Sequence, residues 1–171
     1  MESFQDVVTT YNTDIEPQDF RHIIGHFMSG VSVITTSLDG QQYGLTASAV
    51  TSLSLEPPML IVCINQNAGT SHTISQKKQF VVNILHEEQG SIAKQFATPS
   101  DDKFKGIEVG KTATGLPVLA DCHVSIACEL VEEHVGGTHK IFIGRPTEVI
   151  IHEQTKPLAY YRGKFGKFIQ E

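Results

Sequence analysis

The sequence predicts a mostly β fold, an antiparallel barrel or sandwich with peripheral helices, and of the two we favour the barrel. About seven short runs rich in β-branched residues are typical of strands, whereas two segments have a convincing helical pattern. The strand-like runs follow one another without the β–α alternation of a doubly wound parallel sheet. Neither G-x-G-x-x-G nor the P-loop motif occurs, so we expect no Rossmann-type nucleotide site.

The first expected element is a helix that begins at Pro17, a residue suited to a first helical turn, and ends at Gly30. Its apolar face is formed by Phe20, Ile23, Ile24, Phe27 and Met28. The residues before it are polar and aperiodic, so we expect an N-terminal arm at 1–16 and one domain at 17–168. The arm carries acids and no base before Arg21, which is the reverse of a secretion signal.

A hairpin and a buried strand are expected next. The hairpin joins strands at 31–36 and 43–50 through the turn dipeptide Asp39-Gly40. The sequence Glu56-Pro57-Pro58 then predicts an extended break. The continuous apolar run at 59–64 predicts a strand buried on both faces.

Two helical segments and several further strands are expected in the second half. Thr70 or Ser71 would cap a helix that runs to Lys78, and a strand at 79–85 follows. A helical pattern covers 86–96, and the long polar loop at 98–115 is a candidate lid. The last expected strands, separated by breaks at 136–137 and 144–146, are 124–131, 139–143 and 147–152.

Composition and charge exclude several classes of function. With 19 acidic and 13 basic residues the chain has a formal charge of -6, and no basic cluster is longer than Lys77-Lys78, so a nucleic-acid partner is not expected. No apolar run approaches the roughly 20 residues that span a bilayer. The three cysteines have no metal-ligand spacing, and we expect free thiols in a cytoplasmic protein.

Motifs for metal or hydrolytic chemistry are weak. His22 and His26 have i, i+4 spacing, but no H-E-x-x-H motif forms and no third ligand can be named, so no metal is expected. The sequence contains no G-x-S-x-G elbow and no pair of acids in an apolar setting.

Three features could bind a ligand, although each also has a structural interpretation. A stretch dense in hydroxyls is either a solvent-facing strand or a ligand-binding one; it contains Thr46, Ser48, Thr51, Ser52 and Ser54. Thr70 and Ser71 could cap a helix or, with its N–H groups, bind a phosphate. His139 follows the flexible Gly136-Gly137-Thr138 and would stand at the start of a strand, at the mouth of the barrel, where barrels often hold ligands.

Several stretches taken together resemble the short flavin reductases. In order, they are GLTASAVTSLSLEPP at 44–58, MLIVCI at 59–64, FVVNIL at 80–85, FA at 96–97, DKF at 102–104, GTH at 137–139 and PLAYYRG at 157–163. From about Phe20 to Phe168 the chain is similar to the small reductase components of two-component flavin-dependent monooxygenases of the 4-hydroxyphenylacetate and phenol type. The resemblance implies a Greek-key split β-barrel homodimer that reduces FMN or FAD with NADH or NADPH. Reduced flavin would pass to a separate oxygenase component.

The resemblance also implies where the isoalloxazine ring would lie. Hydroxyls and backbone N–H groups of two stretches would bond its polar edge: Val33, Ile34, Thr35 and Thr36, and Thr46, Ala47, Ser48 and Ala49. Donors at that edge stabilise the negative charge that arrives with a hydride. Ser54 and Phe96 are also expected among the cofactor-binding residues.

The rest of the site is carried over by position. Cys63, Asn65, Thr70 and Ser71 would lie along the ribityl chain and phosphate, where a helix N-terminus favours an anion. Asn83 would present a buried amide to the flavin, and Lys103 would pair with phosphate. The expected catalytic residue, in contact with the nicotinamide cofactor, is His139, with Tyr160, Tyr161 and Arg162 at the same mouth.

Two departures from the family pattern leave questions open. Ala49 stands where a Ser or Thr is common, and Thr138 replaces the Asp of the commoner G-D-H form. Selection of NADPH over NADH would need a 2′-phosphate partner, for which Lys103, Arg145 and Arg162 are candidates. The alternatives to a flavin reductase are a flavin-binding barrel for storage or sensing, and a flavin-dependent ferric reductase.

Overall fold

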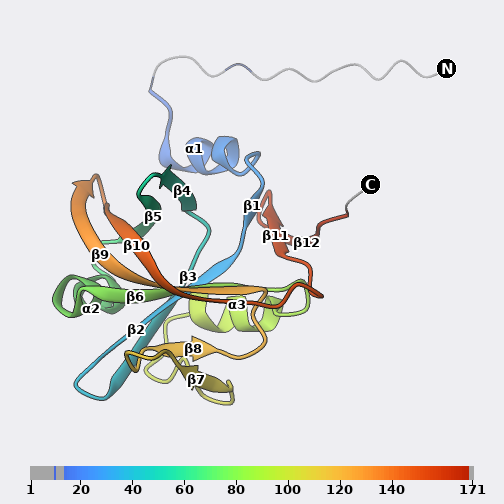
Figure 1. The fold of residues 1–171 in the computed structure, drawn as a ribbon. Helices are drawn as coiled ribbons and strands as arrows, with labels where there is room; N and C mark the ends of the chain where they lie inside the picture. Colours follow the sequence, from blue (N-terminus) through green and yellow to red (C-terminus); the bar gives the residue numbers. More distant parts are fainter. Residues whose placement is uncertain (1–9, 11–13, 170–171) are drawn as a thin grey trace.

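The structure is a computed structural model that describes residue 10 and residues 14–169. Most of the arm expected at 1–16 therefore lies outside the described residues. The described part is mostly antiparallel β, as the sequence predicts, and Figure 1 shows long crossing strands flanked by short helices. These helices are α1 (Pro17–Ile24), α2 (Gly69–Lys77) and α3 (Gly90–Ala97).

A seven-stranded antiparallel sheet forms the body of the fold, in the order β3-β2-β6-β9-β10-β5-β4. Its strands are β2 (Ser32–Leu38), β3 (Gln41–Ala47), β4 (Val50–Leu55), β5 (Pro58–Asn65), β6 (Gln79–Ile84), β9 (Val124–Gly136) and β10 (His139–Ile151). Two small sheets flank it: β1 (Ser29–Gly30) with β11 (Leu158–Tyr161) and β12 (Lys164–Lys167), and β7 (Val109–Lys111) with β8 (Pro117–Leu119). The expected hairpin around Asp39-Gly40 is confirmed as β2 and β3.

Two main apolar clusters fill the interior on either side of β2. Phe80, Phe142 and Ile74 of α2 belong to the first, and Phe96 of α3 and Leu158 of β11 belong to the second. All five side chains are buried. The contacts that form the core of the sheet therefore also hold α2 and α3 against it.

Residues 139–151 form one long strand rather than two. Register shifts at Ile143/Gly144 and Pro146/Glu148 absorb the expected break at 144–146 as bulges in the pairing with β9. A Cβ added at Gly144 would lie 2.6 Å from the Phe80 ring and 3.0 Å from Cβ of Cys128. The missing side chain at this position therefore lets the Phe80 ring pack against the strand backbone.

Three other expected elements differ from the structure. The first helix ends at Ile24 rather than before Gly30, because the chain turns after Gly25 into the short strand β1. β5 alternates buried and half-buried residues instead of being buried on both faces, since one face lines an open pocket. The helix expected at 86–96 starts only at Gly90, because His86 bridges to Pro157 in a β-pairing.

The Gly144→Ala variant should lower the free energy of unfolding by about 1–3 kcal/mol, because its methyl group would overpack a buried ring. Chemical denaturation measures this. Gly166→Ala is the matched control, since a Cβ there has no neighbour within 4 Å. Equal stabilities for the two variants would contradict the close contact at Gly144.

Candidate functional site

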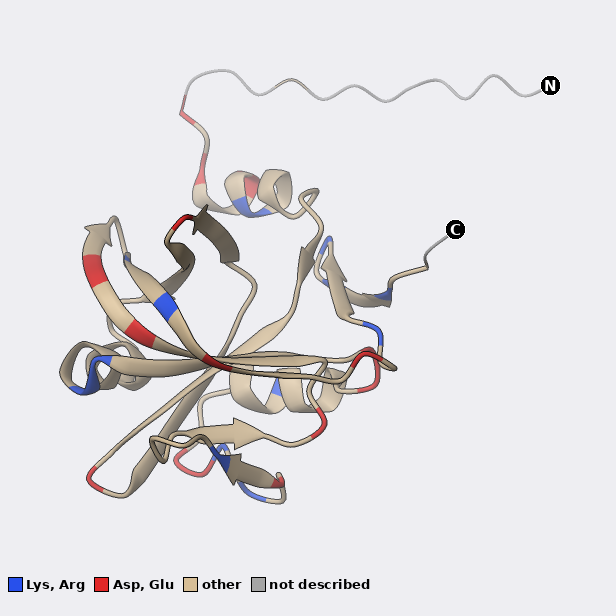
Figure 2. Cartoon of the chain, in the orientation of Figure 1, with Lys and Arg blue, Asp and Glu red and all other residues tan. Residues whose placement is uncertain are grey.

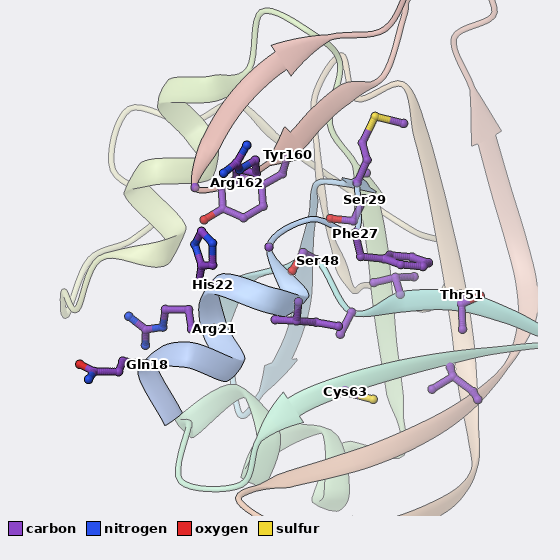
Figure 3. Close-up of a pocket in the computed structure, with 18 residues that line it drawn as sticks. Gln18, Arg21, His22, Phe27, Ser29, Ser48, Thr51, Cys63, Tyr160 and Arg162 are labelled. Atoms are coloured by element: carbon purple, nitrogen blue, oxygen red, sulfur yellow. The ribbon is translucent and has the colours of Figure 1, made fainter. Parts of the chain in front are cut away.

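A pocket of about 1060 Å³ lies between α1, the β11–β12 turn, the β3–β4 connection and β5 (Figure 3). Its apolar lining includes Ile24, Phe27, Met28, Val50 and Ile61, and Ser29, Ser48 and Thr51 add hydroxyls. The other lining residues are Gln18, Arg21, His22, Gly25, Gly30, Ala49, Cys63, Tyr160, Arg162 and Gly163. An apolar pocket of this size with a few polar groups is typical of a binding site for an organic ligand.

Alternate residues of β5 line one wall of the pocket. Ile61 and Cys63 lie on the half-buried face of this strand, and the next residue on that face is Asn65. The register pairs Cys63 with Ile141 of β10, and Asn65 with His139. Directly opposed residues in an antiparallel pair share a face, with Cβ atoms about 4.5–5.5 Å apart. Asn65 and His139 therefore continue this wall beyond Cys63.

The C-terminal hairpin holds α1 against this wall. The Arg162 N–H donates to the carbonyl oxygen of Gly25 at 2.9 Å, immediately after the helix. β1 pairs with β11, with Ser29 opposite Tyr160. The His26 and Tyr161 rings meet edge to face with centroids 6.4 Å apart. These contacts place the side chains of α1 and of the hairpin turn around one end of the pocket, as Figure 3 shows.

The β3–β4 connection provides backbone donors. β3 ends at Ala47 and β4 begins at Val50, so Ser48 and Ala49 lie outside the ladder. The Ala49 carbonyl accepts a hydrogen bond from the Cys63 N–H at 3.0 Å, which fixes the connection to the pocket wall. Within the described residues, the N–H groups of Ser48 and Ala49 donate to no backbone carbonyl. They are available to a ligand with acceptor atoms along its edge.

The charges around the pocket are all of one sign. Arg21 and Arg162 line it and His22 lies beside them, whereas no Asp or Glu lines it. Burial raises the pKa of the Cys63 thiol, so Cys63 remains protonated at neutral pH and does not form a nucleophilic thiolate. The pocket is therefore suited to binding an anionic ligand and carries no activated cysteine.

The structure brings five of the predicted site residues to the pocket and places two at its margin. Ser48, Ala49, Cys63, Tyr160 and Arg162 line it. The two at the margin are Asn65 and His139, where the Thr138 hydroxyl oxygen lies 2.9 Å from Nδ1 of His139.

Other predicted residues lie in the core with their polar groups already bonded. Val33, Ile34, Thr35 and Thr36 are buried in β2. The Thr35 hydroxyl donates to the Pro117 carbonyl at 2.6 Å, and the Thr36 hydroxyl donates to the Gln79 carbonyl at 2.8 Å. Their side chains are part of the barrel packing and do not face the pocket.

Asn83 has both ends of its side-chain amide bonded within the protein. Its Nδ2 donates to the Val33 carbonyl and to the Thr35 hydroxyl, each at 3.0 Å. Its Oδ1 accepts from the Leu119 N–H at 3.1 Å and from the Ser125 hydroxyl at 3.0 Å. Both amide atoms are fully engaged and the residue is buried, so Asn83 links β6 to three other strands, β2, β8 and β9.

Lys103 and the expected lid are also structural. Lys103 Nζ donates to the Phe96 carbonyl at 2.9 Å, and burial lowers the pKa of this lysine. Gln95 donates to the carbonyls of Lys103 and Lys105, and the Phe96 and Phe104 rings pack edge to face 5.0 Å apart. The loop at 98–115 is thus attached to α3, and none of its residues lines the pocket.

The remaining predicted residues lie outside the pocket lining. The Thr46 hydroxyl donates to the Ala93 carbonyl at 2.6 Å, and Ala47 is buried nearby. Ser54 is half-buried opposite Met59. Thr70 and Ser71 are buried in the first turn of α2, where the Ser71 hydroxyl oxygen has no partner. Tyr161 lies behind the pocket against His26.

Sequence reasoning missed the contribution of the first helix. Gln18, Arg21 and His22 line the pocket from α1, and Phe27 and Met28 line it from the segment that follows. The available signal was the amphipathic pattern of this segment, whose apolar face includes Phe27 and Met28. In the structure none of the α1 residues is buried, so this face is turned to the pocket and to solvent.

The comparisons with known proteins agree on one family. Residues 24–168 match the flavin reductase like domain. The chain is 44% identical over 155 residues to the reductase component of a 4-nitrophenol 4-monooxygenase/4-nitrocatechol 2-monooxygenase from Rhodococcus opacus, covering 91% of this chain and 83% of that protein.

Solved structures agree with the sequence comparison. The flavin reductase PheA2 in its native state is 36% identical, with a TM-score of 0.83 over 91% of this chain and 100% of that one. An NADH:FAD oxidoreductase from Streptomyces globisporus, in complex with NAD and FAD fragments, is 26% identical with a TM-score of 0.86, covering 92% of this chain and 98% of that one.

No helix in the part of the chain that the structure describes has the length and apolar character needed to span a membrane. No group of three or more His, Cys, Asp or Glu side chains among residues 10 and 14–169 is arranged to hold a metal ion.

The Asn83→Ala variant should lose about 2–4 kcal/mol of unfolding free energy, because the substitution leaves several buried polar groups without a partner. Urea denaturation measures the change. The exposed Asn67→Ala variant is the control and should stay within about 0.5 kcal/mol of the wild type. A stable Asn83→Ala protein would show that the amide has no structural role.

Proposed function

The chain belongs to the flavin reductase-like family, and from that membership we propose that it transfers hydride from NADH or NADPH to FMN or FAD. The reduced flavin is released to a separate oxygenase component, as the name of the Rhodococcus opacus relative indicates for that protein. The observation that carries this proposal is the pocket itself, which combines apolar walls, backbone donors and a cationic end.

The residues present fit a flavin nucleotide. Its flat ring system needs apolar contacts on its faces, which Ile24, Val50 and Ile61 offer. Its polar edge needs hydrogen-bond donors, and the Ser48 and Ala49 N–H groups and the Ser48 hydroxyl are at hand. Its phosphate is an anion, and no Asp or Glu lines the pocket to repel it.

The protein acts through alignment and electrostatics. A bound flavin and a reduced nicotinamide would supply the hydride-transfer chemistry. The donors of the β3–β4 connection stabilise the negative charge that this transfer leaves on the ring, because they are held in place before the reaction. No side chain needs to form a covalent bond, in keeping with the protonated Cys63 thiol.

We place the nicotinamide beside His139 at the margin of the pocket. His139 and Asn65 face each other across β10 and β5, next to the wall that includes Cys63. Thr138 contacts Nδ1 of His139 and thereby limits rotation of the imidazole ring. A fixed ring at this position orients the nicotinamide towards the flavin, and orientation is the main requirement for hydride transfer.

A homodimer in the cytoplasm is part of the proposal. β4 is an edge strand of the seven-stranded sheet, and it exposes Leu53 at 44% and Leu55 at 86%. Phe20 and Phe27, in and after α1, are 55% and 76% exposed. A second copy seated on β4 and α1 would cover this apolar surface and close the open side of the pocket. The free thiols at Cys63, Cys122 and Cys128 suit a reducing compartment.

The purified protein with added FMN or FAD should oxidise NADH or NADPH faster than the free flavin does, as followed by absorbance at 340 nm. His139→Ala should lower kcat about tenfold or more and leave flavin affinity unchanged, because it removes only nicotinamide alignment. His134→Ala, an exposed histidine paired with Glu132, is the control. Turnover no faster than that of free flavin would disprove the reductase proposal.

The protein should sediment in solution at about twice its chain mass of 18.8 kDa. Replacing both Leu53 and Leu55 by Asp should shift it to the monomer, because charge would enter an apolar interface. Sedimentation velocity distinguishes the two states. Ile151→Asp, at the far end of β10, is the control and should leave the dimer intact. A monomeric wild-type protein at micromolar concentration would exclude the dimer.

A further inference from the structure

We infer that Arg21 of α1 and Arg162 of the β11–β12 turn form a phosphate-binding subsite at one end of the pocket. The inference rests on the proposed function, which it deepens: the site recognises the phosphate groups of its nucleotide ligands through these two guanidinium groups. Neither residue is part of the hydride-transfer step.

The distribution of charge is the first support. The chain is acidic, with a formal charge of -6, yet the pocket lining contains two arginines and a histidine and no carboxylate. Figure 2 shows basic residues on α1 and at the β11–β12 turn, and α1 also carries the acidic Asp19, which does not line the pocket. A concave surface of one sign concentrates ligands of the opposite charge.

Both guanidinium groups are available for a ligand. The other arginine of the chain, Arg145, forms an ion pair in which its Nη2 lies 2.9 Å from Oε2 of Glu129. By contrast, Arg21 and Arg162 have no ion pair and no side-chain hydrogen bond with any of the residues that the structure describes. Unpaired arginines in a pocket suit a planar, bidentate contact with phosphate oxygens.

The backbone fixes the two arginines relative to each other. The Arg21 carbonyl accepts the Gly25 N–H at 3.1 Å, and the Gly25 carbonyl accepts the Arg162 N–H at 2.9 Å. Gly25 approaches so closely that a Cβ on it would lie 3.7 Å from the Arg162 Cα. The backbones of the helix and the turn are thus linked, so both arginines line the same pocket from elements that are fixed to each other.

The conformation of Arg162 is the second support. Arg162 has φ 48° and Gly163 has φ 79°, so the turn requires two left-handed residues. The β2–β3 turn has the same geometry at Asp39 and Gly40, with φ 50° and 83°, and uses the Asp-Gly pair that such turns favour. An arginine in this position costs about 1 kcal/mol relative to Gly or Asn, and strain of this kind is characteristic of functional sites.

The phosphate could belong to either nucleotide. FMN and FAD carry phosphate on the ribityl chain, NADH carries a pyrophosphate, and NADPH adds a 2′-phosphate. The binding chemistry is the same in each case. The experiment below therefore separates the sources by comparing ligands that differ only in phosphate content.

The test measures equilibrium binding to the intact protein by fluorescence quenching for riboflavin and FMN, and by calorimetry for NADH and NADPH. The variants are Arg21→Gln and Arg162→Asn, because asparagine tolerates the left-handed conformation. Lys111→Gln, an exposed charge on β7 outside the pocket lining, is the matched control. Circular dichroism checks that each variant is folded.

Loss of a charge-assisted contact should weaken binding of the phosphate-bearing ligand about tenfold or more. A loss for FMN but not for riboflavin assigns the subsite to the flavin phosphate. A larger loss for NADPH than for NADH assigns it to the 2′-phosphate, and equal losses for both with unchanged FMN assign it to the pyrophosphate.

The inference is overturned if FMN and riboflavin weaken equally while NADH and NADPH are unaffected, or if no ligand changes by more than the Lys111→Gln control. Failure of the proposed function is a separate outcome. A wild-type protein that binds FMN more tightly than riboflavin but does not turn over NADH or NADPH would disprove the reductase and retain the phosphate subsite.

Discussion

The attachment of α1 to the C-terminal hairpin is the constraint on which the pocket depends. α1 buries none of its own residues, so its position does not come from core packing. It is set by the Arg162 to Gly25 hydrogen bond and the β1–β11 pairing, with Tyr161 against His26. The hairpin is itself anchored by the buried Leu158. The Leu158 carbonyl accepts a hydrogen bond from the Val31 N–H, and the Leu158 N–H donates to the Leu85 carbonyl. The second apolar cluster therefore fixes the position of α1 indirectly, through Leu158 of the hairpin.

The sequence was sufficient to predict the fold class and much of the central sheet, because the strands there have clear β-branched patterns and turn dipeptides. The hairpin at Asp39-Gly40 is the simplest example. Short strands such as β1, β7 and β12 were missed, since segments of two to four residues have no detectable periodicity. The extent of the first helix was overestimated because Phe27 and Met28 extend its apolar spacing beyond the residue at which the backbone turns.

Positions in the pocket wall could be predicted where a continuous segment lines the pocket, whereas the bonding of polar side chains inside the core could not. Ser48, Ala49 and Cys63 were expected in the pocket and lie there. Asn83 and Lys103 were expected to bind the ligand, but each has its polar atoms bonded within the protein. A polar residue in an apolar strand looks the same in a sequence whether its partner is a ligand or a backbone group. Only the three-dimensional positions of Leu119 and Ser125 reveal the partners of Asn83.

The walls of the pocket come from segments that are far apart in the chain. Helix α1 and β1 lie near the N-terminus, the β3–β4 connection and β5 follow, and the hairpin turn at Arg162 lies close to the C-terminus. Contacts between segments so far apart in the sequence form slowly, and the chain is synthesised from its N-terminal end. The pocket therefore forms only after the last strands have been made and docked, when the core clusters already have most of their residues. The ability to bind a ligand is therefore gained late in folding, after the hairpin has packed Leu158 into the second apolar cluster.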